Sequence, residues 1–135
     1  MSIQKVNTGL HPSQFQLHDA WIVFKLNDSP IRTELDGELD FIALMDAASC
    51  YIVGSEMVNV TAIELQKITA KRLLKKGQTQ AKRLPNTLYI PHNLSAQILA
   101  AEADRLGITV VSIAEEKLMN FIGEARDGFN ERFGA

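Results

Sequence analysis

The residues most able to do chemistry in this sequence are basic ones that cluster between Gln66 and Asn86. This segment holds seven basic residues and no acidic one: Lys67, Lys71, Arg72, Lys75, Lys76, Lys82 and Arg83. Lys67, Lys71 and Lys75 recur every four residues, so a helix would place them in one stripe on its surface. Such a stripe can neutralise the phosphates of RNA or DNA. The same pattern is also typical of the solvated face of an amphipathic helix.

Two aliphatic residues on the same predicted helix face favour a different partner. Leu65 and Ile68 lie on the side that carries the basic residues, and no aromatic side chain lies between Glu64 and Leu88 to stack on bases. The segment from Asp19 to Glu56 holds eight acidic and two basic residues. In a self-complementary dimer, the basic face with its apolar centre on one copy would dock against the acidic segment of the other copy. The sequence thus leaves nucleic acid and a second copy of the chain as alternative partners.

Motifs for metals, cofactors and nucleophiles have little support in the sequence. His11, His18 and His92 lack the short pairwise spacings typical of structural zinc sites. Cys50, the only cysteine, sits in an apolar run, which favours a small buried residue over a nucleophile paired with His92. The glycines form no phosphate-binding loop motif, so we expect no nucleotide cofactor. Because the histidines lack paired spacing, we also expect no metal. The loop of residues 91–93 leads into a predicted helix N-terminus, which would hold an anion or only water and a cap.

Length and composition indicate one domain. The chain has 135 residues, of which 46% are hydrophobic and 22% charged, as in an ordinary globular protein. No apolar run approaches the roughly 20 residues that cross a bilayer, the N-terminus has no apolar signal segment, and one cysteine cannot form an internal disulfide. We therefore expect a cytoplasmic protein with no membrane contact. An irregular N-terminal arm over residues 1–18 would precede a single α/β domain over residues 19–135.

Hydrophobic periodicity predicts the elements that must position these residues, with a change from strand-like to helical periodicity near residue 60. The predicted strands are residues 20–26, 39–45, 50–54, 87–90 and 108–111. The predicted helices are residues 61–76, ended by Gly77, a second one from Asn93 or Ser95 through Leu106, and a last one that begins at a capping box over residues 112–115. Strands joined through helices run parallel, while the first three can form an antiparallel meander.

This order of elements, β-β-β-α-β-α-β-α, resembles that of the ribonuclease H-like fold, which includes the cores of integrases and transposases. The stretch from Phe41 to Gly54 is similar to the second and third strands of those cores, because an Asp-x-x-Ser turn at Asp46 and Ser49 precedes an apolar strand that ends in glycine. The similar topology covers about residues 20–133. The resemblance implies a mixed five-stranded sheet in ribonuclease H-like order, with helices on both faces.

Active proteins of the ribonuclease H-like fold use carboxylates from the first strand, the end of the fourth strand and a helix to hold two divalent cations. In this chain the first predicted strand has no acidic residue, and residues 90–93 place none at the end of the fourth. The remaining candidates, if the chain is an enzyme, are Asp46, Glu115, Glu116 and Glu124. For Asp46, a turn-closing bond to Ser49 is favoured over a role as a metal ligand. The resemblance therefore implies the fold and argues against the two-metal activity.

The sequence as a whole predicts a non-catalytic binding or assembly module. Its contact surface would include the basic helix over residues 61–76, with Leu65 and Ile68 in an interface. The alternative is a divergent metal-dependent nuclease or another enzyme that processes nucleic acid.

Overall fold

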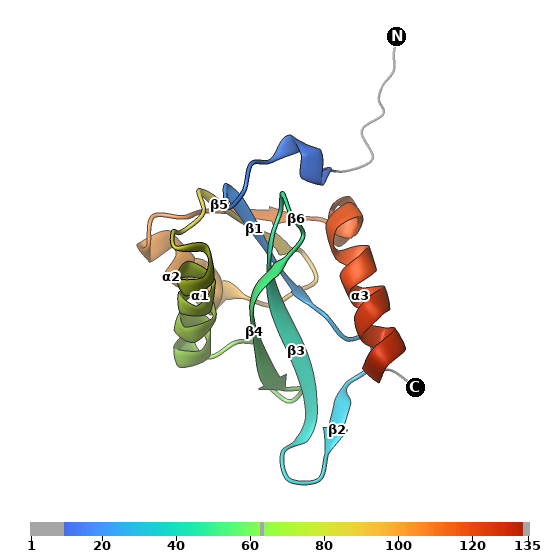
Figure 1. Ribbon diagram of the computed structural model, residues 1–135. Coiled ribbons are helices and arrows are strands. Elements are labelled where there is room, and N and C mark those ends of the chain that lie inside the picture. The colour runs from blue at the N-terminus through green and yellow to red at the C-terminus, as the bar shows by residue number, and fades with distance from the viewer. Residues whose placement is uncertain (1–9, 63, 134–135) are drawn as a thin grey trace.

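The computed structural model describes residues 10–62 and 64–133, which form a mixed sheet with helices on both faces (Figure 1). The strands are β1 (Ala20–Lys25), β2 (Ile31–Thr33), β3 (Gly37–Asp46), β4 (Ile52–Asn59), β5 (Thr87–Pro91) and β6 (Thr109–Ile113). The helices are α1 (Lys67–Ala81), α2 (Gln97–Arg105) and α3 (Met119–Phe133), with short 3-10 helices η1 (Pro12–Gln14) and η2 (Glu115–Leu118). No helix in the described ranges is long and apolar enough to cross a bilayer.

The sheet is organised around β1. This strand pairs antiparallel with β3, with Trp21 opposite Asp46 and Lys25 opposite Ile42, and it pairs parallel with β5. β5 in turn pairs parallel with β6, while β4 and the short β2 both pair antiparallel with β3. The order β4-β3-β1-β5-β6 is the one expected for the ribonuclease H-like fold, so the predicted fold class is confirmed. β2 is an addition that the sequence did not indicate.

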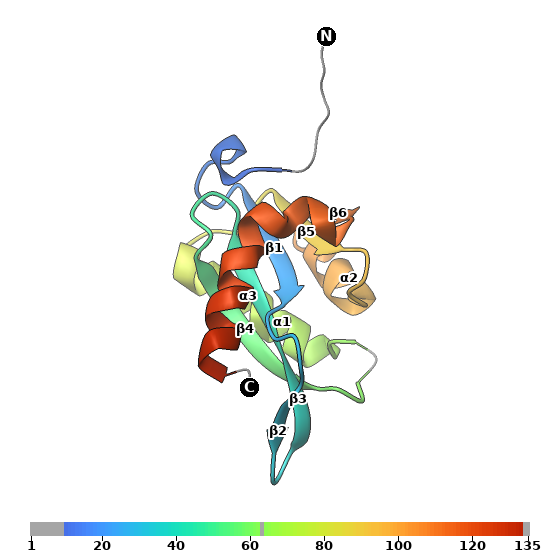
Figure 2. The same ribbon diagram turned by 90° about the vertical axis from the view of Figure 1, so that its right-hand side faces the viewer.

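Apolar residues on both faces of β1 build two cores. Trp21 and Val23 pack on the side covered by α1 and α2, whereas Ile22 and Phe24 pack on the side covered by α3. Figure 2 shows α3 on one side of the sheet and α1 and α2 on the other. Strand residues alternate between the two faces of a sheet, so a strand that is apolar throughout must lie in its interior.

The helix expected over residues 61–76 instead begins at Lys67 and continues past Gly77. The preceding residues form a turn, in which Asn59 Oδ1 accepts hydrogen bonds from the backbone N–H (2.9 Å) and the hydroxyl (2.6 Å) of Thr61. Asparagine side chains compete with helices in this way, because they offer the backbone local hydrogen bonds.

Two other predicted element ends were wrong. β4 continues past Gly54, where the sequence suggested a stop. Ser112 lies in β6 and forms no capping box, because η2 follows Ala114. The expected arm over residues 1–18 contains η1 in its described part, and residues 1–9 lie outside the described residues.

Two glycines allow α1 to lie close to the sheet. A Cβ atom on Gly77 would come within 2.8 Å of the Trp21 ring and 2.9 Å of Leu44 Cδ2. Across the contact, a Cβ atom on Gly54 of β4 would lie 3.0 Å from the Cβ of Lys76. Gly77 therefore serves as a packing residue inside α1 and not as its C-terminal cap.

We expect Gly77→Ala to lower the free energy of unfolding by about 1–3 kcal/mol, because the added methyl group overpacks the contact with Trp21. Gly128→Ala is the matched control, since its Cβ position in α3 has no described atom within 4 Å apart from neighbouring residues and the backbone of the same helix. Alanine should stabilise that helix by up to about 1 kcal/mol. Urea denaturation of both variants measures the difference. Equal stabilisation by the two substitutions would contradict the close packing at Gly77.

Candidate functional site

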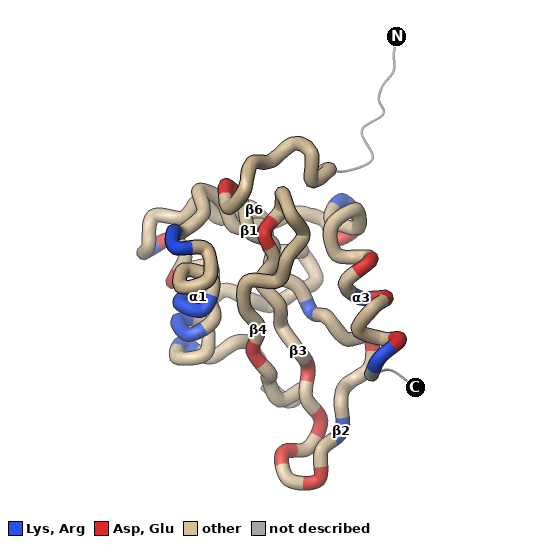
Figure 3. Tube along the Cα trace, viewed as in Figure 1, with Lys and Arg blue, Asp and Glu red and all other residues tan. Residues whose placement is uncertain are grey.

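The exposed side of α1 carries the lysine stripe expected from the sequence. Lys67, Lys71 and Lys75 are exposed, and within the described part of the chain none of them forms an ion pair. Their spacing places successive lysines about 6 Å apart along the helix axis. Ile68, beside the stripe, is 71% exposed. Figure 3 shows the basic residues gathered on α1.

Leu65 was placed on the wrong face by the sequence argument. It is only 4% exposed and belongs to the core that also contains Leu73, Leu74 and Leu99. Leu65 precedes the first residue of α1, so helical periodicity does not apply to it. Of the two aliphatic residues proposed for an interface, the structure exposes Ile68 alone.

Arg72 and Lys76 do not belong to the unpaired stripe, because both contact Glu56 of β4. Arg72 Nη2 lies 2.8 Å from Glu56 Oε1, its Nε donates to both carboxylate oxygens, and Lys76 pairs with Oε2. Glu56 is 7% exposed. A carboxylate at this depth needs charged partners, because burial without them is costly.

The electrostatics of Glu56 reflect this pairing. Burial alone would raise the pKa of its carboxyl, but the hydrogen bonds and charges of Arg72 and Lys76 outweigh it, so the pKa of Glu56 is lowered. The two cations are therefore already engaged within the chain. The sequence missed this, because Glu56 and Arg72 lie 16 positions apart.

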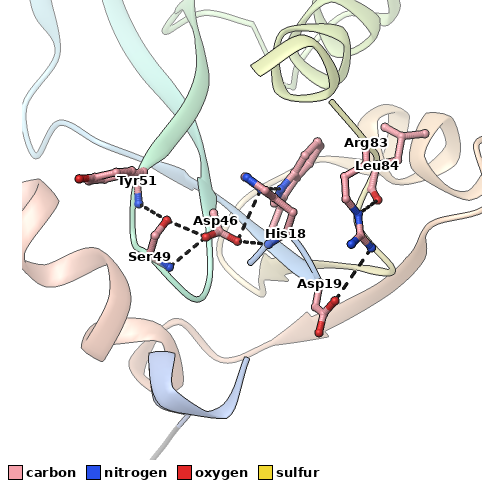
Figure 4. Close-up of polar contacts among 8 residues, drawn as sticks. His18, Asp19, Asp46, Ser49, Tyr51, Arg83 and Leu84 are labelled. Atoms are coloured by element: carbon pink, nitrogen blue, oxygen red, sulfur yellow. Dashed lines mark hydrogen bonds and ion pairs between the residues drawn. The ribbon is translucent and has the colours of Figure 1, made fainter. Parts of the chain in front are cut away.

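The last two basic residues of the segment lie beyond the end of α1. Lys82 caps the helix with left-handed backbone (φ 63°). Arg83 Nη2 approaches Asp19 Oδ1 at 3.9 Å, and its Nε donates to the carbonyl oxygen of Leu84 at 3.3 Å (Figure 4). Neither residue continues the stripe, since each follows the last turn of the helix.

A groove of about 370 Å³ separates α1 from α2. Lys71, Lys75 and Arg105 line it together with the apolar side chains of Leu74 and Leu106. This groove combines cations with an apolar floor, a combination that the linear sequence does not show.

Glu102 brings one acidic side chain into the same groove. Arg105 Nη2 lies 3.0 Å from Glu102 Oε1. The hydrogen bond from Arg105 is the main cause that lowers the pKa of Glu102, and it outweighs burial with help from the charges of Lys71 and Lys67. The basic segment, which has no acid in sequence, therefore faces one in space.

The turn at Asp46 is built as the sequence suggested. Asp46 Oδ2 accepts hydrogen bonds from the backbone N–H (2.9 Å) and hydroxyl (2.6 Å) of Ser49, and Oδ1 accepts the N–H of His18 (2.7 Å; Figure 4). Asp46 is fully buried, and both His18 and Cys50 adopt left-handed backbone beside it. Both oxygens of Asp46 are thus occupied by bonds that hold the backbone.

The candidate carboxylates do not form one centre. Asp46 pairs with Trp21 at the beginning of β1, whereas Glu115 follows β6, whose parallel neighbours end at the opposite edge of the sheet. Glu116 and Glu124 are exposed on η2 and α3. No group of three or more His, Cys, Asp or Glu side chains among the described residues is placed to hold a metal ion.

Cys50 and His92 also lie at opposite edges of the sheet and form no pair, because Cys50 adjoins Asp46 and His92 follows β5. Burial, followed by the negative charges of Asp46 and Glu124, raises the pKa of the Cys50 thiol. A raised pKa keeps the thiol protonated near neutral pH and unreactive.

A polar cavity of about 410 Å³ lies at the carboxyl ends of β1 and β5. Its charged lining residues are Lys25, Asp28, Asp40, Glu64, Glu115 and Arg126. Ligands of open α/β sheets bind outside the carboxyl ends of strands where the strand order reverses, and the order reverses here between β1 and β5. The predicted strand order could therefore have indicated this cavity, although no motif marks it.

Most charges in this cavity are satisfied by the chain itself. Arg126 Nη2 donates to Glu115 Oε2 at 2.7 Å and its Nε donates to the carbonyl oxygen of Lys25 at 2.9 Å. The bond from Arg126 is the main cause that lowers the pKa of Glu115. Glu64 Oε2 accepts the N–H of Ile98 at 2.8 Å. At the N-terminus of α2, where the sequence suggested an anion or a cap, a carboxylate of the same chain is the cap.

We expect Asp46→Ala to lower the free energy of unfolding by about 3 kcal/mol, because it leaves three partly buried donors of His18 and Ser49 without their acceptor. Ser49→Ala removes one of these bonds and should cost about 1 kcal/mol. Thermal denaturation of the two variants tests this order. A stable Asp46→Ala protein would contradict the structural role of the carboxylate and revive Asp46 as a ligand or catalytic group.

Glu56→Gln should lower the free energy of unfolding at pH 7 by about 1 kcal/mol, a modest value because Arg72 and Lys76 are half exposed. Since the pKa of Glu56 is lowered in the folded state, its contribution is present above the unfolded value of 4.5 and is lost as the pH falls through the folded value. Urea denaturation of wild type and variant at pH 7 and pH 3 should show the difference shrinking in acid. A difference that is the same at both pH values would contradict the ion pairs.

Comparison with known proteins gives the fold but no family. No protein-family model matches the chain, and no curated protein matches it. Among solved structures, it is similar to a chain in the cryo-EM structure of a simian T-cell lymphotropic virus intasome in complex with PP2A regulatory subunit B56 gamma. The TM-score is 0.59 at 12% identity, over 98% of this chain and 43% of that chain, so this chain spans less than half of its length. At such low identity the likeness shows the fold alone, in agreement with the strand order of the sheet.

Proposed function

We propose that this chain is a non-catalytic assembly module that associates with another protein subunit, namely a second copy of this chain. Its contact surface is the α1 face, defined as Lys67, Ile68, Lys71 and Lys75. The observation that carries the proposal is a set of three exposed lysines beside an exposed isoleucine, with no ion pair to these lysines in the described part of the chain. A partner with acidic side chains around an apolar centre would complement this face.

Three features favour a protein partner over nucleic acid. Glu56 engages Arg72 and Lys76, so fewer cations are available for phosphates than the sequence count suggests. Glu102 adds a negative charge to the adjoining groove. Ile68 offers apolar contact, whereas α1 has no aromatic residue on which a base could stack. Nucleic acid therefore remains the alternative outcome of the test.

The proposal that the module lacks catalysis rests on the position of the carboxylates. A two-metal nuclease needs several carboxylates around one point. Here β1 contributes a lysine at its end, and β5 is followed by residues 92–93 with no acid. Asp46 is engaged in its turn at the other edge of the sheet.

Charge reversal of the α1 face tests the assembly. We expect Lys71→Glu with Lys75→Glu to weaken self-association about tenfold or more, measured by analytical ultracentrifugation over a concentration series. Lys117→Glu with Arg132→Glu changes the net charge equally at exposed positions outside the α1 face and should leave association unchanged. Equal effects of the two double variants would contradict a role for the α1 face.

The same proteins distinguish a nucleic-acid partner. Retention of labelled DNA and RNA on filters at low and high salt should be weak and equal for wild type and Lys71→Glu with Lys75→Glu. Tight retention by the wild type alone, falling steeply with salt, would replace the protein partner with nucleic acid.

Incubation with Mg²⁺ or Mn²⁺ tests the proposed lack of nuclease activity on DNA, RNA and hybrid duplexes. No cleavage is expected. Cleavage that is lost in Glu115→Gln or Glu116→Gln would establish a divergent nuclease instead, and these positions are chosen because neither is buried.

A further inference from the structure

The hairpin formed by β2 and β3 presents an acidic tip made of Glu34, Leu35 and Asp36. All three residues are exposed, and Leu35 is 96% exposed. Figure 1 shows the hairpin projecting from the body of the molecule, and Figure 3 shows its acidic residues at the far end. Leu35 lies between two acids and contributes to neither core, so its side chain is accessible to another molecule.

Hydrogen bonds fix the backbone that carries the acidic tip. Thr33 Oγ1 donates to the carbonyl oxygen of Gly37 (2.8 Å) and accepts the N–H of Asp36 (3.0 Å). Asn59 Nδ2 donates to the carbonyl oxygen of Asp36 (3.0 Å), and Gly37 takes the left-handed backbone (φ 78°) that closes the turn. The exposure of Leu35 is thus built into the turn, which reduces the entropy lost when the tip binds.

The groove between α1 and α2 complements the acidic tip in charge and spacing. Lys71 and Lys75 are about 6 Å apart along the helix. Glu34 and Asp36 are separated by one residue, so their Cα atoms are at most about 7 Å apart. Leu106, which is 38% exposed, supplies apolar surface in the groove for a leucine side chain, and Leu74 lies buried beneath it.

We propose that the acidic tip of one copy docks in the α1–α2 groove of a second copy of this chain. Leu35 lies against the apolar floor, and Glu34 and Asp36 pair with Lys71 and Lys75. This inference rests on the proposed assembly function. It identifies the acidic tip as the surface that binds to Lys71 and Lys75 of the α1 face and to the adjoining groove. Within one chain, tip and helix lie apart (Figure 3), and no ion pair joins them in the described ranges.

The acidic tip and the groove are different surfaces of the chain. If two copies exchange tips reciprocally, the interface is isologous and closes as a dimer; otherwise the contact is heterologous and extends into a ring or a longer chain. In either arrangement every copy offers one tip and one groove, so association depends on both surfaces at once.

A charge exchange between two variants tests the docking. Glu34→Lys with Asp36→Lys gives a copy with a basic tip and a basic groove, whereas Lys71→Glu with Lys75→Glu gives a copy with an acidic tip and an acidic groove. Each variant alone should associate about tenfold more weakly than the wild type in analytical ultracentrifugation. An equimolar mixture should regain association, because each tip then meets a groove of opposite charge.

Two controls complete the design. Asp127→Lys with Glu131→Lys makes the same change in net charge on exposed positions of α3 and should leave self-association unchanged. Leu35→Ser tests the apolar part of the contact without a change in charge, and it should weaken association that persists at high salt. Circular dichroism confirms that each variant remains folded.

The outcomes separate the two proposals. If the lysine variant loses association but the tip variants keep it, the α1 face stands as the contact surface and docking of the tip is wrong. If only the tip variants lose it, the role of the α1 face is wrong. A monomeric wild type, a mixture that does not associate, or association that disappears after nuclease treatment would each overturn the docking.

Discussion

The close packing of α1 against the sheet determines which residues this helix buries and which it exposes to solvent. Gly77 lies against Trp21 and Leu44 at a distance that leaves no room for a side chain. Leu73 and Leu74 are buried on the same side of the helix. Once these positions face the sheet, helical geometry leaves Lys71 and Lys75 in solvent. The rotation of α1, and therefore the composition of its exposed face, follows from one packing contact in the core.

The same contact divides the cations of α1 into two groups. Arg72 and Lys76 lie on the side of the helix next to β4, and Glu56 on that strand is buried deeply enough to need both of them. Removing one partner of a buried charge is more costly than the pair itself is favourable, so these cations stabilise the fold before they can serve a ligand. Among the described residues, Lys67, Lys71 and Lys75 have no such partner, so their charges are not engaged in the fold.

Apolar runs and short residue spacings correctly predicted the strand and the turn that depend on neighbouring residues. The strand that begins at Ala20 is largely apolar on both faces, and it is the central strand of the sheet. Asp46 and Ser49 have the spacing of a turn, and they form one. Helical periodicity failed at Leu65, where a turn fixed by Asn59 precedes the helix, and at Gly77, where glycine serves packing rather than termination. The outcome at Leu65 follows from a local turn that competes with the helix, whereas the outcome at Gly77 depends on Trp21 and Leu44, which are distant in sequence and whose proximity a single sequence does not show.

The unequal lengths of the strands explain why the acidic tip lies apart from the α1 face. β3 has ten residues and β1 has six, so β3 continues past the end of β1. β2 pairs with this extension, at the register Ile31 to Leu39, and not with the buried centre of the sheet. The turn between β2 and β3 is therefore held away from both cores, and its sequence is free of packing constraints. Glu34 and Asp36 are tolerated there because their charges stay in water, and hydrogen bonds from Thr33 and Asn59 hold the turn that exposes Leu35.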